Sequence, residues 1–276
     1  YIFQTPTPLS ENSTEGFTER SSNPKLIQKG GVYQGSTNLQ LEESSLGNAV
    51  YFTTDGSEPT LSSQVFGTNS RTVSSTTTYK FKTIEQGKLP SNTITYTYLI
   101  GISHDLPVVS ISTEPDNLWS DESGIYVRGT NGIDGNGSNG PANWNQDWEI
   151  PLFIEYYEVD NTLGFSSGAG GKIYGAWSRL NAQKSLAVYF RGEYDNSELD
   201  YKLFKSKEID QFQAFILRNS GNDFNNTHFR DALMTTLVEE SEVDLQAYNP
   251  TVVYLNGEYW GIHNMREKIN EHYIES

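Results

Sequence analysis

The sequence predicts two domains, an all-β sandwich followed by an α+β domain with an antiparallel sheet. Up to about Leu99, short β-branched and aromatic segments alternate with clusters of Gly, Asn, Ser and Pro at the spacing typical of a sandwich. From Leu106 the apolar segments become longer, and one amphipathic helical pattern interrupts them. A chain of 276 residues forms one large domain or two modest ones, and this change of pattern favours two.

The composition excludes several kinds of partner and site. Nineteen Lys and Arg residues against 35 Asp and Glu give a net charge of −16, which repels nucleic acid and anionic membrane surfaces. The absence of cysteine excludes disulfides and thiolate metal sites, and no apolar run is long enough to span a membrane. The acidic composition, rich in Asn, Thr and Tyr, is typical of a bacterial protein that is secreted or held at the cell surface. We therefore expect its partner to be an extracellular or cell-surface protein, or a glycan.

Residues 1–23 are predicted to be a linker. Pro6 and Pro8 alternate with threonines, and prolines remove hydrogen-bond donors and favour extended backbone. The chain opens at Tyr1 with neither an initiator Met nor the basic start of a signal peptide. We expect it to be a processed chain or a piece of a longer one.

Residues 24–100 carry the predicted strands of the first domain. These strands cover residues 32–33, 39–41, 49–53, 76–82 and 93–99. Asp55-Gly56 is typical of a tight turn, and Pro59 ends the strand ladder after it. Residues 51–60 resemble a signature of the modules at the C-termini of chitobiase and β-hexosaminidase proteins and of fibronectin type III-associated repeats. The resemblance implies an immunoglobulin-like accessory module without catalytic activity.

Residues 105–276 are predicted to form the second domain. The pattern of a buried strand covers 106–112, and further strands are predicted at 148–159, 172–174, 186–190 and 212–217. Residues 251–263 have the pattern of a hairpin with a type I′ turn at Asn256-Gly257. We expect a curved sheet with one packed helix.

Two helices are predicted in this domain. Asn226 or Thr227 caps the first, and an apolar stripe that should face the core extends to about residue 240. The stripe consists of Phe229, Leu233, Leu237 and Val238. The second helix is predicted to begin near Arg266.

Four strings of the second domain resemble the CotH kinase family of atypical protein kinases. They are residues 175–179 with 184–186, residues 217–223, residues 229–233 and residues 254–268. The resemblance implies the N-lobe of such a kinase, which transfers the γ-phosphoryl group of ATP to a protein hydroxyl with Mg²⁺ or Mn²⁺. It also implies that Lys184 and Arg179 hold the phosphates, because a kinase fixes its phosphate-binding lysine beside the sheet. The alternative is a solvated edge, where Lys and Arg commonly flank a strand.

Several other residues are candidates for the nucleotide site. Arg218 and Asp223 follow a buried strand, where they could bind nucleotide and metal or simply form a turn. Glu267 could pair with Lys184 or face a metal-bound nucleotide, or lie on a solvated helix face. Glu239 and Glu240 are rival partners for Lys184.

Arg230-Asp231 opens the first predicted helix. An aspartate in this position complements the helix dipole without a catalytic role. The pair is not the catalytic loop of classical kinases, because no histidine precedes it and no asparagine stands five residues after the aspartate.

A weak calcium loop is predicted in the Gly- and Asn-rich segment of the second domain. Asp134, Asn136 and Ser138 place oxygen ligands at alternating positions, but Asn145 stands where a calcium loop has glutamate. A plain flexible loop is the alternative. Trp144 and Trp148 lie close by and could stack on a sugar or belong to the core.

The residues leave the activity open between two functions. Hydrolase motifs are absent, and nothing from Leu106 to Ser276 supplies a carboxylate base with metal-holding acids at a recognisable spacing. In the family, these acids belong to a C-terminal lobe that would follow Ser276. We therefore expect this chain alone to be inactive, as a fragment of a secreted CotH-like kinase. The alternative is a non-catalytic surface module that binds a protein or a glycan.

Overall fold

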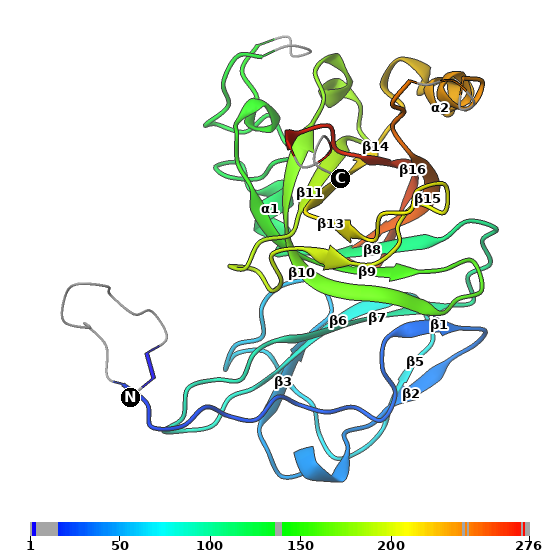
Figure 1. Cartoon of the computed structure of the whole chain (residues 1–276). Helices are drawn as coiled ribbons and strands as arrows, with labels where there is room; N and C mark the ends of the chain where they lie inside the picture. The colour runs from blue at the N-terminus through cyan, green and yellow to red at the C-terminus, as the bar shows by residue number, and fades with distance from the viewer. Residues whose placement is uncertain are drawn as a thin grey trace. The chain divides into compact units, whose positions relative to one another are not determined.

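A computed structural model describes residues 2–3, 16–135, 140–238, 241, 243–271 and 273 of the chain. The chain divides into two compact units, Tyr1–Ser103 and His104–Ser276 (Figure 1). Each unit has its own hydrophobic core. The predicted fold class, a β-sandwich followed by an α+β domain with an antiparallel sheet, is confirmed.

The first unit consists of two sheets that enclose an aromatic core. The strand order of the larger sheet is β1-β7-β6-β3-β4, and β2 pairs with β5 in the smaller one. The strands are β1 (Gly31–Tyr33), β2 (Thr37–Leu39), β3 (Val50–Thr53), β4 (Gln64–Val65), β5 (Arg71–Val73), β6 (Thr77–Thr83) and β7 (Ile94–Ile100), and a 3-10 turn, η1, covers Glu43–Ser45. Phe52, Tyr79 and Phe81 stack in the core, with ring centroids 5.6–6.3 Å apart.

The signature segment 51–60 is held to this sheet by polar contacts. Gly56 has a φ of 93°, which an Asp-Gly turn requires, and the Asp55 carboxylate accepts a hydrogen bond from the Ser57 amide at 3.0 Å. Glu58 then forms ion pairs with Lys80 at 3.0 Å and Lys82 at 3.1 Å on β6. The predicted turn is therefore fixed at both sides.

Seven strands of the second unit close into a barrel. The order is β10-β11-β14-β16-β15-β8-β9 (Figure 1). The strands are β8 (Val108–Ser112), β9 (Ile150–Tyr157), β10 (Leu163–Tyr174), β11 (Ser185–Tyr189), β14 (Ala214–Arg218), β15 (Tyr248–Leu255) and β16 (Glu258–Glu267), and β12 (Leu199–Asp200) pairs with β13 (Gln211–Phe212) outside the barrel. All neighbours in the barrel are antiparallel except β8 and β15, which run parallel from Val108↔Val252 to Ile111↔Leu255. The sheet thus curves further than expected, because β8 pairs on both of its edges.

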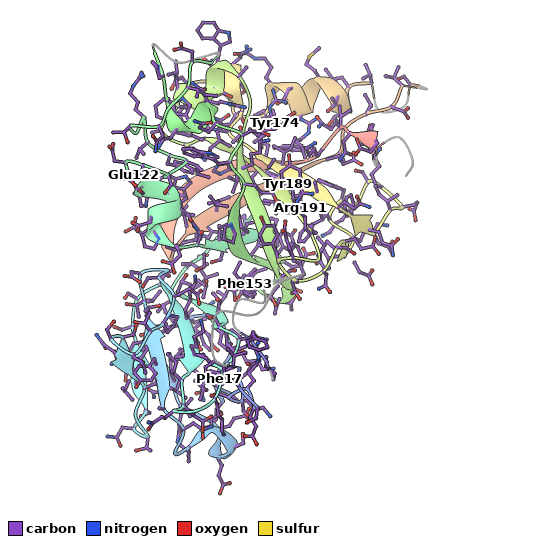
Figure 2. All side chains as sticks on the ribbon, turned by 90° about the vertical axis from the view of Figure 1, so that its left-hand side faces the viewer. Phe17, Glu122, Phe153, Tyr174, Tyr189 and Arg191 are labelled. Carbon is purple, nitrogen blue, oxygen red and sulfur yellow. The ribbon has the colours of Figure 1, made fainter. Side chains whose placement is uncertain are left out.

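Alternation along these strands separates the two faces of the barrel wall. Leu186, Leu217 and Met265 belong to the apolar interior. Side chains between them in the strands point outward, as do Tyr174 of β10 and Tyr189 of β11, which Figure 2 labels. The guanidinium of Arg191, just after β11, lies 4.9 Å from the Tyr189 ring centre. The outer face of the wall therefore carries tyrosines and arginines beside apolar residues such as Ile216.

The hairpin of β15 and β16 confirms the predicted type I′ turn. Asn256 and Gly257 have φ values of 49° and 84°, as both central residues of this turn require. Val253 pairs with Gly261 and Tyr254 with Tyr259, so Trp260 is the extra residue of a β-bulge.

The helical predictions need two corrections. The helices and 3-10 turns of this unit are α1 (Pro115–Trp119), η2 (Asn143–Asn145), η3 (Trp177–Leu180), η4 (Gly221–Asp223) and α2 (Arg230–Thr236). Arg266 does not begin a helix, because β16 continues to Glu267 while it pairs with both β14 and β15, but Glu271 and Tyr273 are helical. The cap of α2 is Phe229, not Asn226 or Thr227.

The apolar stripe of α2 is also turned away from the core. All four stripe residues, Phe229, Leu233, Leu237 and Val238, are between 45% and 69% exposed. The inner face instead carries Asp231 and the buried Ala232, because Asp231 pairs with arginines of the barrel wall. In the described part of the chain, no helix has the length and hydropathy that crossing a membrane takes.

Candidate functional site

Cationic side chains gather on both faces of the wall formed by β11, β14 and β16. We call Lys184, Arg179 and Arg128 the inner cation cluster, and Arg218 with Arg266 the outer arginine pair. The first cluster surrounds Trp144 at the end of the barrel, and the second lies on the outer face beneath α2. Each of the two clusters could hold an anion.

Lys184 is a buried ammonium group beside which the described residues place no carboxylate. It precedes β11, is 3% exposed, and donates hydrogen bonds to the main-chain oxygens of Arg179 at 2.6 Å and Asn181 at 3.0 Å. Its Nζ also lies 4.1 Å from the ring centre of Trp144. Burial, with a smaller effect from Arg128, lowers the pKa of Lys184 to about 8. No described carboxylate offsets this, so the surroundings favour either loss of the proton or the arrival of an anion.

Arg179 and Arg128 complete the inner cation cluster. Arg179 donates from Nε to the Gly175 oxygen at 2.6 Å and from Nη1 to the Trp144 oxygen at 3.1 Å, which ties η3 to η2. The Arg128 guanidinium lies 5.4 Å from the Trp144 ring centre, so two cations contact one indole. Arg128 was missed at the sequence level, because nothing in the spacing connects it with Lys184.

His263 lies buried beneath the same cluster. Its Nδ1 accepts a hydrogen bond from the Gln183 side chain at 3.0 Å, so its Nε2 donates to the Lys184 oxygen at 3.2 Å. Burial lowers the pKa of His263 to about 4, and the ring is therefore neutral at physiological pH. This neutral ring fixes the backbone of Lys184 without adding a charge.

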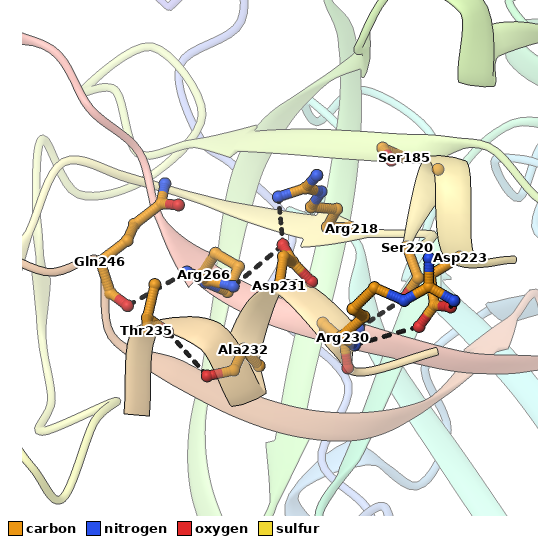
Figure 3. A network of polar contacts seen from close by, with 12 residues as sticks. Ser185, Arg218, Ser220, Asp223, Arg230, Asp231, Ala232, Thr235, Gln246 and Arg266 are labelled. Carbon is orange, nitrogen blue, oxygen red and sulfur yellow. Dashed lines mark hydrogen bonds and ion pairs between the residues drawn. The ribbon is translucent and has the colours of Figure 1, made fainter. Parts of the chain in front are cut away.

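The outer arginine pair shares a single carboxylate. Arg218 ends β14, and Arg266 pairs with Ile216 on β16, two residues away on the same face. Arg266 Nη1 lies 3.1 Å from Asp231 Oδ2, and Arg218 Nη1 donates to that same oxygen (Figure 3). Arg266 is 2% exposed and also donates to the Gln246 oxygen at 3.2 Å. Among the described residues, Asp231 is the one carboxylate that forms ion pairs with these two guanidinium groups, and Glu267 acts on Arg266 without an ion pair.

A pocket of about 410 Å³ opens over this pair. It is lined by Arg218, Arg266 and by residues of η3 and η4, and we call it the outer pocket. The buried Asn219 joins its two rims, because its Nδ2 donates to the Ser178 oxygen of η3 at 3.3 Å and its Oδ1 accepts from the Gly221 amide of η4 at 3.0 Å. The volume of the outer pocket falls within the usual range for small-ligand sites.

Asp223, predicted as a turn residue or a metal ligand, contacts the first residue of α2. Its carboxylate accepts hydrogen bonds from the Arg230 amide at 3.0 Å and from Thr227, and pairs with the Arg230 side chain at 3.2 Å. Hydrogen bonding, first of all from Thr227, lowers the pKa of Asp223 to about 2. The structure thus shows the turn, and the role of Asp223 as a metal ligand stays a prediction.

Glu267 does not form the predicted pair with Lys184. It accepts a hydrogen bond from the Ala247 amide at 2.6 Å and lies 3.7 Å from Lys207. The ring of His263, four residues earlier on β16, is what contacts Lys184, so Glu267 lies further along the strand. The rival partners Glu239 and Glu240 lie outside the described residues.

The calcium prediction stays untested. Asp134 is exposed, whereas Asn136 and Ser138 lie outside the described residues. Within the ranges that the structure describes, no three His, Asp or Glu side chains form a group that could hold a metal. Trp144 is buried in the barrel core and Trp148 packs against it, which agrees with the core alternative rather than a sugar platform.

Comparison with protein families assigns both parts of the chain. The family model of the chitobiase/beta-hexosaminidase C-terminal domain matches residues 28–95, and that of the CotH kinase protein matches residues 172–276. Both resemblances predicted from the sequence are confirmed, in that order. An immunoglobulin-like domain therefore precedes a CotH domain, and the CotH match contains Lys184 and the outer arginine pair but not Trp144. A search of curated proteins finds no match.

Proposed function

We propose that the second unit is the nucleotide-binding part of an ATP-dependent protein kinase that acts outside a bacterial cell. The match to the CotH kinase protein supports the general relationship. The observation that carries the proposal further is the buried, uncompensated ammonium of Lys184. A polyphosphate supplies the negative charge that this site lacks, and phosphoryl transfer depends mainly on positioning and charge stabilisation.

The donor set of the inner cation cluster fits a polyphosphate chain. Lys184 would hold one phosphate as a point charge, and the planar groups of Arg179 and Arg128 would make bidentate contacts with others. When bound, ATP with Mg²⁺ or Mn²⁺ supplies the transferred phosphoryl group. The structure describes no cluster of acids for the metal, so the described residues are assigned only to binding and orientation.

Access to Lys184 requires a local rearrangement. The ring of Trp144 covers the ammonium group, which already donates hydrogen bonds to two main-chain oxygens. Once η2 moves aside, which breaks the bond from Arg179 to the Trp144 oxygen, a phosphate oxygen would accept from the third N–H of the ammonium. The freed Arg179 guanidinium would then face the incoming phosphates.

Thermal unfolding in the presence of MgATP tests this proposal. At a concentration of 100 times its Kd, a ligand adds about 2.7 kcal/mol to the free energy of unfolding. We expect such a shift for the native protein, and none for Lys184→Met, which keeps the aliphatic stem and removes the charge. Lys202→Met, at a lysine with 45% of its side chain exposed, is the matched control and should respond like the native protein. An equal shift in Lys184→Met would refute the assignment of Lys184.

A non-catalytic binding module is the second candidate. The bonds of Lys184 and Arg179 all end on main-chain oxygens of η2, η3 and the loops on either side of η3, which is the pattern of side chains that brace a rigid loop. On this proposal an extracellular or cell-surface protein or a glycan contacts the outer surface. The absence of any MgATP shift in the native protein would favour it.

A further inference from the structure

We propose that the outer pocket is a second anion site, which binds a dianionic phosphate monoester independently of any nucleotide at Lys184. The ligand would be a phosphate group carried on a side chain or on a small molecule. The inference goes beyond the kinase proposal and does not depend on it, because it rests on residues of the opposite face of the barrel wall.

The polar contacts of the outer arginine pair favour the binding of an anion. Two guanidinium groups share one oxygen of Asp231, the one carboxylate of the described residues with which they form ion pairs. Arg266 is 2% exposed, and among the described residues its Nε has no hydrogen-bond acceptor. A buried donor without an acceptor is costly, and a phosphate offers three oxygens in the geometry that guanidinium groups prefer.

The walls of the pocket fit the rest of such a ligand. Ser178 and Asn222 lie on its rims and offer polar contacts, while Trp177 is 71% exposed and offers a flat apolar face. Gly175 allows the close turn that leads into η3. It has a φ of 104°, and a Cβ at this position would lie 2.6 Å from Ser178 Oγ. The pocket is thus shaped by backbone constraints as well as by side chains.

The two anion sites are separated by the barrel wall. The outward residues Ser185, Arg218 and Arg266 line the outer pocket, whereas the ammonium of Lys184 contacts Trp144 of the interior core. Successive side chains of a strand point to opposite faces. One phosphate therefore cannot contact both clusters.

Ligand binding would compete with Asp231 and so act on α2. Figure 3 shows Asp231 extending from α2 between the two arginines. A dianion outcompetes the single charge of this carboxylate, and α2 then loses its ion pairs to the wall. Removing the carboxylate should accordingly tighten ligand binding, because the competitor is gone.

Titration calorimetry with phenyl phosphate at pH 7.5 tests the proposal on the whole chain. We expect the native protein to bind phenyl phosphate about tenfold more tightly than phenyl sulfate, which carries one charge less. Arg218→Gln should weaken binding about tenfold or more, because it removes a charged hydrogen-bond donor. Asp231→Asn should strengthen it, a gain that a misfolded protein does not produce. Lys202→Met, outside both sites, should leave it unchanged.

Four results would contradict or support separate parts of the proposal. No binding of phenyl phosphate by the native protein, or an unchanged affinity in Arg218→Gln, would overturn the site. Unchanged affinity in Asp231→Asn would overturn the competition with α2. Equal binding of glycerol phosphate and phenyl phosphate would remove Trp177 from the site. Loss of MgATP binding in Lys184→Met with phenyl phosphate binding intact would show that the two sites are separate, and failure of the MgATP assay alone would leave this inference standing.

Discussion

At the scale of single residues, some residues of the two cation clusters could be predicted from the sequence, whereas others are brought together only by the fold. Lys184, Arg179 and Arg218 could be chosen as candidates because they flank strands inside family-like strings. Arg128 and the role of Asp231 could not, because their partners come from distant strands or from a helix whose orientation is not encoded locally. Glu267 failed as a partner for Lys184 because its place on β16 follows from the strand register.

The buried neutral His263 makes stability depend on pH. Its pKa falls to about 4 in the folded chain, below the ordinary value of 6.5, so the unfolded chain binds its proton more readily. This contribution is complete above pH 6.5 and is lost as the pH falls from 6.5 to 4, and it amounts to about 3 kcal/mol. Urea unfolding across this range should show the loss in the native protein and a smaller loss in His263→Gln. The half-buried His104 gives the control variant His104→Gln, which should keep the native slope; an equally steep slope in His263→Gln would contradict this account.

At the scale of elements, local turn chemistry was predictable and orientation was not. The hairpin of β15 and β16 follows from Asn256-Gly257, whose φ values no neighbouring element needs to impose. The rotation of α2 does not follow from its apolar periodicity, because it depends on the ion pairs that Asp231, outside the stripe, forms with the barrel wall. The extension of β16 through Arg266 likewise depends on pairing with β14.

The exposed stripe of α2 predicts tolerance to polar substitution. Leu233 is 45% exposed, so Leu233→Ser should change the free energy of unfolding by less than about 0.5 kcal/mol. Leu217→Ala, at a leucine that is 1% exposed inside the barrel, should cost about 2–5 kcal/mol. Denaturant unfolding of both variants measures the contrast. A large loss in Leu233→Ser would mean that the stripe is buried in solution.

At the scale of the whole molecule, the sequence predicted two folded parts and the class of each. The boundary between them could be predicted because the short strand segments of the first part give way to longer apolar segments from Leu106. Closure of the barrel was not predictable, because it depends on a parallel pair between the first and the second-last strand of the domain. No periodicity within either strand records that pairing.

The separate cores predict independent responses to core mutation. Phe81 and Phe215 are fully buried, the first in the sandwich core and the second in the barrel core. Phe81→Ala and Phe215→Ala should each remove about 3–5 kcal/mol from the unit that contains the residue. Differential scanning calorimetry should resolve two transitions, and each variant should lower one of them. A single transition lowered by both variants would show that the units unfold together.

The parallel pairing of β8 with β15 has a consequence for biosynthesis. β8 leaves the ribosome at the start of the domain, but β15 and β16 emerge only near the end of the described chain. Until then, the growing sheet β8-β9-β10-β11-β14 has two open edges, at β8 and at β14. Open edges recruit other strands, and long-range closure is slow. The nascent domain is therefore most prone to aggregation just before β15 is synthesised, and a chaperone that covers β8 in that interval would protect it.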